Sequence, residues 1–197
     1  MAGPATQRLS YAEYLALERQ TDTRHQFIDG NAYAMAGGSV RHSALKSRVM
    51  IRLGSQLDGS PCLPLDSDAK VRLVFSADAT YPDFAIVCGG VERHPEDRHA
   101  FTNPTLLAEV LSPTTEKWDR GGKFSLYRTL PSLCFYLLIS TETELVELYT
   151  RNDDETWTLS VHAPGDTLRI DALDLSVDVS DLYDGIPDEP TQDPPTL

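Results

Sequence analysis

Two short apolar runs in the middle of the chain each carry a carboxylate at a place where a buried strand would usually have none. Asp83 opens the run Phe84–Cys88, and Glu109 interrupts the run 105–111. Apolar runs of this length, bounded by proline, glycine and polar residues, are typical of buried strands. A charge in such a strand is costly unless it pairs with another charge or binds a metal. These two runs therefore constrain both the core of the fold and the place of its chemistry.

The elements expected around these runs alternate between helices and strands. Ser10 and Glu13 form a capping box that predicts a first helix, and Ser39 is expected to cap a second helix. An Asp-Gly pair at Asp29 and Gly30 predicts the turn of a hairpin. We expect strands at 69–75, 82–88, 105–111, 133–140 and 144–150, a helix at 118–130, more β structure at 156–162 and 168–177, and a polar loop at 89–103. This order predicts an α/β fold with helices packed on a central mixed sheet.

The composition fits one domain followed by a tail. The chain has 197 residues, of which 41% are hydrophobic, which is enough for one substantial core. From Gly185 the sequence is acidic and rich in proline, so we expect residues 1–184 to form a single domain and residues 185–197 to be disordered.

The cellular setting is expected to be the cytoplasm. No apolar run approaches the roughly 20 residues that a membrane span needs, and no signal peptide is visible. Cys62, Cys88 and Cys134 are far apart and odd in number, so we expect three reduced residues in the core.

The net charge of -13 argues against strong, sequence-independent binding to duplex nucleic acid, which depends on phosphate contacts by lysine and arginine. A nucleic-acid function must therefore use a local basic surface. The best candidate is a stripe of Arg41, Arg48 and Arg52 on the second helix, although a simple solvated face explains this stripe equally well.

A lysine is expected to point inward next to Glu109. At 100° per residue, Lys123 falls on the same helical face as Leu126 and Leu130, which must face the sheet. An inward lysine needs a carboxylate or an oxyanion nearby, and Glu109 and Asp83 are the candidates. A structural ion pair between Lys123 and Glu109 explains the pattern equally well.

Two other positions could join these residues. His42, together with Lys46 on the second helix, could enter the site from the side, although a structural histidine is the more common case. Asp68 could be a third metal carboxylate, although a turn residue is the more common case. The sequence lacks the phosphate-loop, nucleophile-elbow and H-E-x-x-H motifs, which removes the common nucleotide-hydrolase, esterase and zinc interpretations.

Several segments resemble one known family. They are Ser10-Tyr11-Ala12-Glu13-Tyr14-Leu15, Phe27-Ile28-Asp29-Gly30, Arg41-His42, Tyr81-Pro82-Asp83, the run from Pro104 through Glu109-Val110-Leu111-Ser112 to Thr115, Asp119-Arg120, Lys123 and Tyr127. Together they resemble the Uma2 family of proposed restriction endonucleases, over about residues 9–184. The resemblance implies a restriction-endonuclease-like core of the PD-(D/E)XK superfamily, with a central mixed β-sheet flanked by helices and extra β-hairpins.

The resemblance also implies roles for single residues. Asp83 and Glu109 would be the metal-binding carboxylates. The superfamily lysine, two residues after the second acid, is replaced here by Leu111, and Lys123 on the helix would take its place, as is usual in the family. Gln26 stands where the family often has glutamate, which implies weaker metal binding if that glutamate helps to hold the ion.

These observations predict an endonuclease that hydrolyses DNA phosphodiester bonds with Mg²⁺, for which Mn²⁺ can substitute. Asp83 and Glu109 would hold the ion, and Lys123 would orient water or stabilise the phosphate. The supporting residues would be His42, Gln26, Asp68 and Tyr127. A homodimer would suit the cutting of both strands. The alternatives are a catalytically inactive nuclease-fold module that binds a protein or nucleic-acid partner, and hydrolysis of RNA or another phosphodiester.

Overall fold

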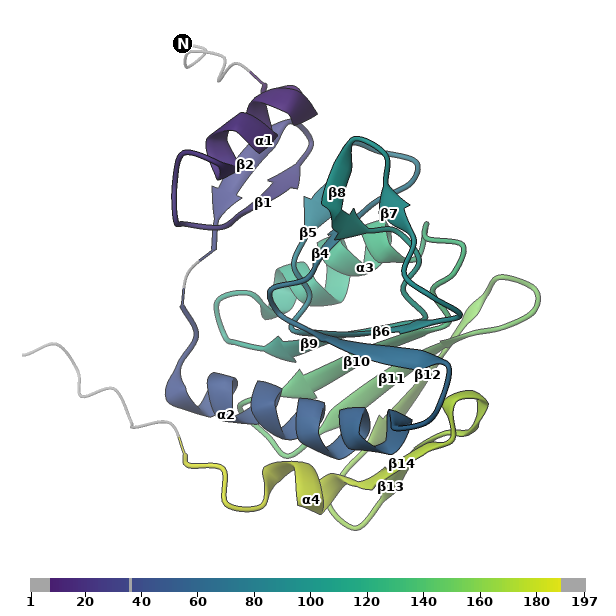
Figure 1. Cartoon of the computed structure of the whole chain (residues 1–197). Coiled ribbons are helices and arrows are strands. Elements are labelled where there is room, and N and C mark those ends of the chain that lie inside the picture. The colour runs from purple at the N-terminus through teal and green to yellow at the C-terminus, as the bar shows by residue number, and fades with distance from the viewer. Residues whose placement is uncertain (1–7, 36, 189–197) are drawn as a thin grey trace, which may run out of the picture.

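Among residues 8–35 and 37–188, which the computed structural model describes, a mixed six-stranded sheet forms the centre of the fold (Figure 1). Its strand order is β12–β11–β10–β9–β6–β3, and β9 and β10 are the parallel neighbours. The strands are β3 (Cys62–Asp66), β6 (Phe84–Cys88), β9 (Leu106–Leu111), β10 (Phe135–Ser140), β11 (Val146–Arg151) and β12 (Trp157–His162). Every residue of β9 and β10 is buried, which explains their almost wholly apolar sequences.

Helical elements cover both faces of this sheet, as the sequence predicted. One face is covered by α2 (Val40–Val49), which continues through a π-helical turn (Met50–Gly54) and a 3₁₀ turn (Ser55–Leu57). The same face carries the hairpin of β13 (Thr167–Ile170) and β14 (Leu175–Asp178), whose strands are joined by a 3₁₀ turn (Asp171–Leu173), and then α4 (Val179–Tyr183). The other face carries a second π-helical turn (Trp118–Lys123) and α3 (Phe124–Tyr127). The fold is therefore the predicted α/β arrangement of a mixed sheet between helices.

A second sheet lies beside α1 (Tyr11–Glu18). Figure 1 shows α1 at the top of the molecule, next to the two strands β1 and β2 of this sheet. The strand order of the sheet is β2–β1–β5–β4–β8–β7. The strands are β1 (His25–Ile28), β2 (Asn31–Ala34), β4 (Lys70–Arg72), β5 (Ala79–Thr80), β7 (Arg93–His94) and β8 (Asp97–Phe101). Asp29 and Gly30 have φ values of 47° and 75°, which is the left-handed conformation that the predicted Asp-Gly turn requires.

The expectation of a polar loop at 89–103 is wrong, because this segment contains β7 and β8. Its strands are rich in charged residues and lack an apolar alternation. One of the residues that β8 buries is Asp97, whose carboxylate lies 2.7 Å from Lys70 Nζ and accepts a hydrogen bond from the Tyr11 hydroxyl. A strand that buries an ion pair cannot be recognised from hydrophobicity.

The arginine stripe is not the exposed basic surface that the sequence suggested. Arg41 is buried, and its guanidinium donates to the carbonyl oxygens of Thr141 and Pro187 at 2.6 and 2.9 Å. Arg48 donates to the Asp184 carbonyl oxygen at 2.6 Å. Residues 184–188 thus contact α2, although the predicted tail began at 185; the rest of that tail, 189–197, lies outside the described residues.

The expectation of three reduced cysteines is also wrong. Cys62 and Cys88 form a disulfide, and Cys134 is a free, partly buried thiol. The two bonded residues are 26 positions apart in the sequence but stand directly opposite each other in the antiparallel pair of β3 and β6. Of the helices in 8–35 and 37–188, none is both long enough and apolar enough to cross a membrane.

Candidate active site

Glu109 is aimed at the helical layer that follows it in the chain. Side chains alternate across a strand, and Ala108 and Val110 of β9 pack on the α2 side of the sheet. Glu109 therefore shares the opposite face with Leu107 and Leu111, which pack toward α3. Its side chain is 2% exposed, so its charge must be balanced inside the protein.

Lys123 supplies that balance from the π-helical turn. Its Nζ lies 2.8 Å from Glu109 Oε2 and 3.0 Å from Asp119 Oδ1. Tyr127 lies one turn further along, and its hydroxyl donates to Glu109 Oε1 at 2.9 Å. The prediction of an inward lysine next to Glu109 is thus matched by the geometry, and Tyr127 reaches the same carboxylate.

Asp83 joins this group from the start of β6. Its Oδ2 accepts a hydrogen bond from the Val110 amide at 2.9 Å, so the carboxylate is fixed to the strand that carries Glu109. On its other side, His42 Nε2 lies 3.4 Å from Oδ2 and Lys46 Nζ lies 3.5 Å from Oδ1. Both side chains come from α2, the helix from which the sequence analysis expected them to enter.

Except for Tyr127 and Lys46, these residues line one cavity of about 250 Å³, which we call the carboxylate cavity. Its walls include Gln26, His42, Asp83, Glu109, Ser112, Asp119 and Lys123. Gln26 comes from β1, so the second sheet contributes one wall of the site. Asp68 does not line the cavity; it is an exposed turn residue whose carboxylate lies 2.5 Å from Arg24 Nη1. A role for Asp68 as a third metal carboxylate therefore has no support in the geometry.

Burial and neighbouring charges set the ionisation of the site. Burial alone would raise the pKa of Asp83, but the hydrogen bonds from His42 and the Val110 amide outweigh it and lower that pKa. Burial raises the pKa of Glu109 to about 8, and the carboxylates of Asp119 and Asp83 add to the rise while Lys123 opposes it. Burial alone would lower the pKa of Lys123, but Glu109 and Asp119 outweigh it and raise that pKa.

The donor set fits a hard divalent cation. Three carboxylates line one cavity, and Glu109 is driven toward its protonated form by burial and by the other two, a tendency that a cation would reverse. Within 8–35 and 37–188, no group of three or more His, Cys, Asp and Glu side chains could hold a metal by itself. A metal ion held by Asp83 and Glu109 alone would need water or substrate for its other ligands, and Mg²⁺ is an ion that keeps several waters in its coordination shell.

Asp119 is the residue of the cavity whose importance the sequence analysis missed. It lies on the inward helical face, four residues before Lys123, and is as deeply buried as Glu109. Its Oδ1 is close to Lys123 Nζ but has no hydrogen bond of good geometry. The i, i+4 spacing of an acid and an inward lysine is the signal that could have identified it.

Comparisons with known proteins agree with this architecture. A family model described as "Uma2: Putative restriction endonuclease" matches residues 11–180. The chain is 38% identical to the protein slr1290 of Synechocystis sp. over 182 residues, which is 91% of this chain and 93% of that protein. It is 32% identical to sll1609 of the same organism over 160 residues, which is 81% of this chain and 90% of that protein.

A solved structure has the same fold. It is the crystal structure of a protein described as a putative nuclease belonging to DUF820 from Anabaena variabilis. The TM-score is 0.72 at 17% sequence identity, and the match covers 89% of this chain and 98% of that chain.

Proposed function

The chain belongs to the Uma2 family, described as putative restriction endonucleases, and from this membership we propose that it is a metal-dependent endonuclease that hydrolyses DNA phosphodiester bonds. One observation supports the proposal more than any other. Asp83 and Glu109, from neighbouring strands, line one cavity with a lysine held 2.8 Å from Glu109. Two carboxylates and a lysine facing one cavity are the parts that phosphodiester hydrolysis needs.

Each residue has a role that follows from its position. Asp83 and Glu109 would hold Mg²⁺ or Mn²⁺, which would supply charge neutralisation at the phosphate and acidify water. Lys123 would stabilise the negative charge that develops on the phosphate oxygens. The Val110 amide and Tyr127 fix the orientation of the two carboxylates, and His42 approaches Asp83 from α2.

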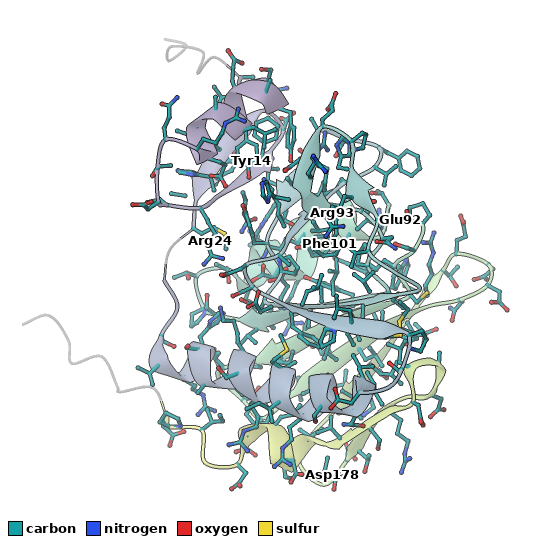
Figure 2. The ribbon with its side chains drawn as sticks, viewed as in Figure 1. Tyr14, Arg24, Glu92, Arg93, Phe101 and Asp178 are labelled. Carbon is teal, nitrogen blue, oxygen red and sulfur yellow. A yellow bond between two sulfur atoms is a disulfide. The ribbon has the colours of Figure 1, made fainter. Side chains whose placement is uncertain are left out.

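The test is nicking of supercoiled plasmid at low salt with Mg²⁺ or Mn²⁺. We expect the wild type to nick the plasmid and EDTA to abolish nicking. Glu109→Gln and Asp83→Asn, which keep the side-chain shape, should each lower the nicking rate at least about 100-fold. Glu92→Gln is the matched control, because Glu92 is an exposed carboxylate that does not line the cavity and that Figure 2 labels on β7's side of the molecule.

Thermal unfolding of each variant keeps the test interpretable. A Glu109→Gln variant that unfolds at the wild-type temperature and still nicks at the wild-type rate would contradict the proposal. A variant that has lost nicking counts as support where its unfolding temperature stays close to that of the wild type.

A specific observation favours a second candidate, an inactive nuclease-fold module that binds a partner. Both oxygens of Glu109 already have partners inside the protein, Lys123 and Tyr127, as in a purely structural ion pair. Under this candidate, divalent metal leaves the unfolding temperature unchanged. A metal that binds the folded site would instead stabilise it, by about 2.7 kcal/mol at a concentration one hundred times its Kd.

A further inference from the structure

Two exposed aromatic side chains lie beside the carboxylate cavity. Trp118 and Tyr33 are 38% and 56% exposed and line a second cavity of about 400 Å³, which we call the aromatic cavity. Gln26 and Ala34 line both the aromatic cavity and the carboxylate cavity. The two cavities therefore adjoin along the β1–β2 hairpin.

Two cationic side chains, Arg24 and Lys46, line a third cavity, and each is already paired with a carboxylate, Asp68 and Asp83 respectively. This third cavity, of about 340 Å³, shares His42 and Asp83 with the carboxylate cavity. Figure 2 shows Arg24 below the α1 layer, on the side where the chain descends to α2. We call these three adjoining cavities together the groove: Arg24 and Lys46 line the third cavity, carboxylates line the carboxylate cavity between, and aromatic rings line the aromatic cavity.

The position of the Trp118 indole is built into the helix that carries Lys123. A Cβ atom placed on Gly122 would lie 1.8 Å from Cζ3 and 1.9 Å from Cε3 of the indole. Glycine at this position is therefore what lets the ring lie against the helix backbone. Because Trp118 directly precedes Asp119, the ring is held at a fixed place relative to the carboxylates.

The charges of the molecule favour an unpaired strand over a duplex. With 17 lysines and arginines against 30 aspartates and glutamates, the chain offers few phosphate contacts to a duplex. Stacking on aromatic rings supplies affinity that does not depend on net charge. A base inside a duplex has both faces covered by its neighbours, so only an unpaired or extruded base can stack on a protein ring.

We propose that the groove binds a single strand of DNA, with one nucleobase stacked on Trp118 and Tyr33 and the backbone running past the carboxylates toward Arg24 and Lys46. This inference rests on the proposed function, since it names the form of DNA that reaches the carboxylates. The aromatic cavity adjoins cavities lined by charged side chains of both signs, which suits a base with its charged backbone and distinguishes this occupant from an apolar side chain of a partner protein.

The test compares binding of a fluorescent oligothymidine of about 12 nucleotides with binding of the matching duplex, by anisotropy at low salt with Ca²⁺. We expect the wild type to bind the strand at least about 10-fold more tightly than the duplex. Trp118→Ala should weaken strand binding about 10-fold and leave duplex binding unchanged. Phe75→Ala is the matched control, because Phe75 is 74% exposed and lines none of the three cavities.

A strand with abasic positions tests the same contact from the side of the ligand. The abasic strand should bind the wild type about as weakly as the normal strand binds Trp118→Ala. Trp118→Ala should then bind the abasic strand with the same affinity as the wild type does. Gly122→Ala, which keeps the indole but displaces it, should weaken strand binding in the same direction. This second variant keeps the test valid if Trp118→Ala does not fold.

The outcomes separate this inference from the proposed function. Equal affinity for strand and duplex, or equal effects of Trp118→Ala and Phe75→Ala, would overturn the inference even if the plasmid is nicked. Tight strand binding that depends on Trp118, without cleavage of plasmid or strand, would uphold the inference and reject the nuclease activity.

Discussion

At the scale of single residues, the candidate site depends on one lysine between carboxylates. Lys123 is 5% exposed, and both Glu109 and Asp119 lie within about 3 Å of its Nζ. Burying such charges is costly, and their mutual attraction offsets much of that cost. Removing the lysine should therefore affect the stability of the core around the candidate site.

Lys123→Met should lower the free energy of unfolding by about 3–5 kcal/mol, because it leaves two buried carboxylates without their cation. Adding Glu109→Gln to this variant should recover part of the loss, because the buried Glu109, whose pKa rises further without the lysine, no longer has to take up a proton. Urea unfolding at neutral pH without divalent metal measures both effects. Lys117→Met, at an exposed position, should change stability by less than about 0.5 kcal/mol. Strictly additive losses in the double variant would contradict the pairing.

The residues that the sequence could locate are those whose placement depends on local periodicity. Glu109 stands out because it interrupts an apolar strand, and Lys123 because the helical repeat fixes its face. Gln26 reaches the cavity only because β1 pairs with β5, some 50 residues further along the chain. Asp68, for which the sequence favoured a turn residue over a third metal carboxylate, is an exposed turn residue paired with Arg24.

At the scale of elements, the second sheet is held together by a buried polar cluster. Asp97 of β8 accepts hydrogen bonds from Lys70 of β4 and from Tyr11 of α1, each at 2.7 Å. Burial alone would raise the pKa of Asp97, but these hydrogen bonds outweigh it and lower that pKa. The cluster links α1 to two strands, so it supports the part of the fold that carries Gln26.

Asp97→Asn should destabilise the protein by about 3 kcal/mol near neutral pH, because Lys70 then stays buried without its counter-ion. The folded-state pKa of Asp97 lies below its unfolded value of about 3.9. The contribution of the Asp97 carboxylate to the free energy of unfolding is therefore complete above about pH 5 and is lost as the pH falls below about 4. At that low pH the wild type and Asp97→Asn should have similar free energies of unfolding. Unfolding free energies measured between pH 3 and pH 8 check this. The exposed Asp153→Asn should track the wild type throughout.

The same cluster explains why β7 and β8 could not be predicted. Hydrophobic alternation identifies strands that bury apolar side chains, and β8 instead buries an aspartate at its first residue. The matching lysine lies 27 positions earlier in the sequence, on a strand that pairs in parallel. Nothing local connects the two residues.

At the scale of the whole molecule, the segment from α4 to residue 188 fastens the helix that reaches the site. α2 directs His42 and Lys46 toward Asp83, while Arg41 and Arg48 bind carbonyl oxygens of the later segment. Figure 1 shows α4 and this yellow segment running along α2. Two arginines of the basic stripe therefore bind this later segment, and one of them, Arg41, is buried.

Arg41→Met should lower the free energy of unfolding by about 1–3 kcal/mol, because the Thr141 carbonyl oxygen loses its buried donor. It should also speed hydrogen exchange of the α2 amides, since the helix loses its tie to Pro187. Exchange followed by mass spectrometry measures the second effect. Arg19→Met, at an exposed position directly after α1, serves as the control. Unchanged exchange in α2 would show that the tie is unimportant.

The contact between Arg41 and Pro187 spans 146 residues, and this separation has a consequence for how the protein is made. A ribosome delivers α2 early and the segment that fastens it late. Asp83, Glu109 and Lys123 leave the exit tunnel while Arg41 still lacks its partner. The helix that brings His42 and Lys46 to the carboxylates is thus secured only after Pro187 has emerged, so a nascent chain carries its carboxylates before this helix is fastened.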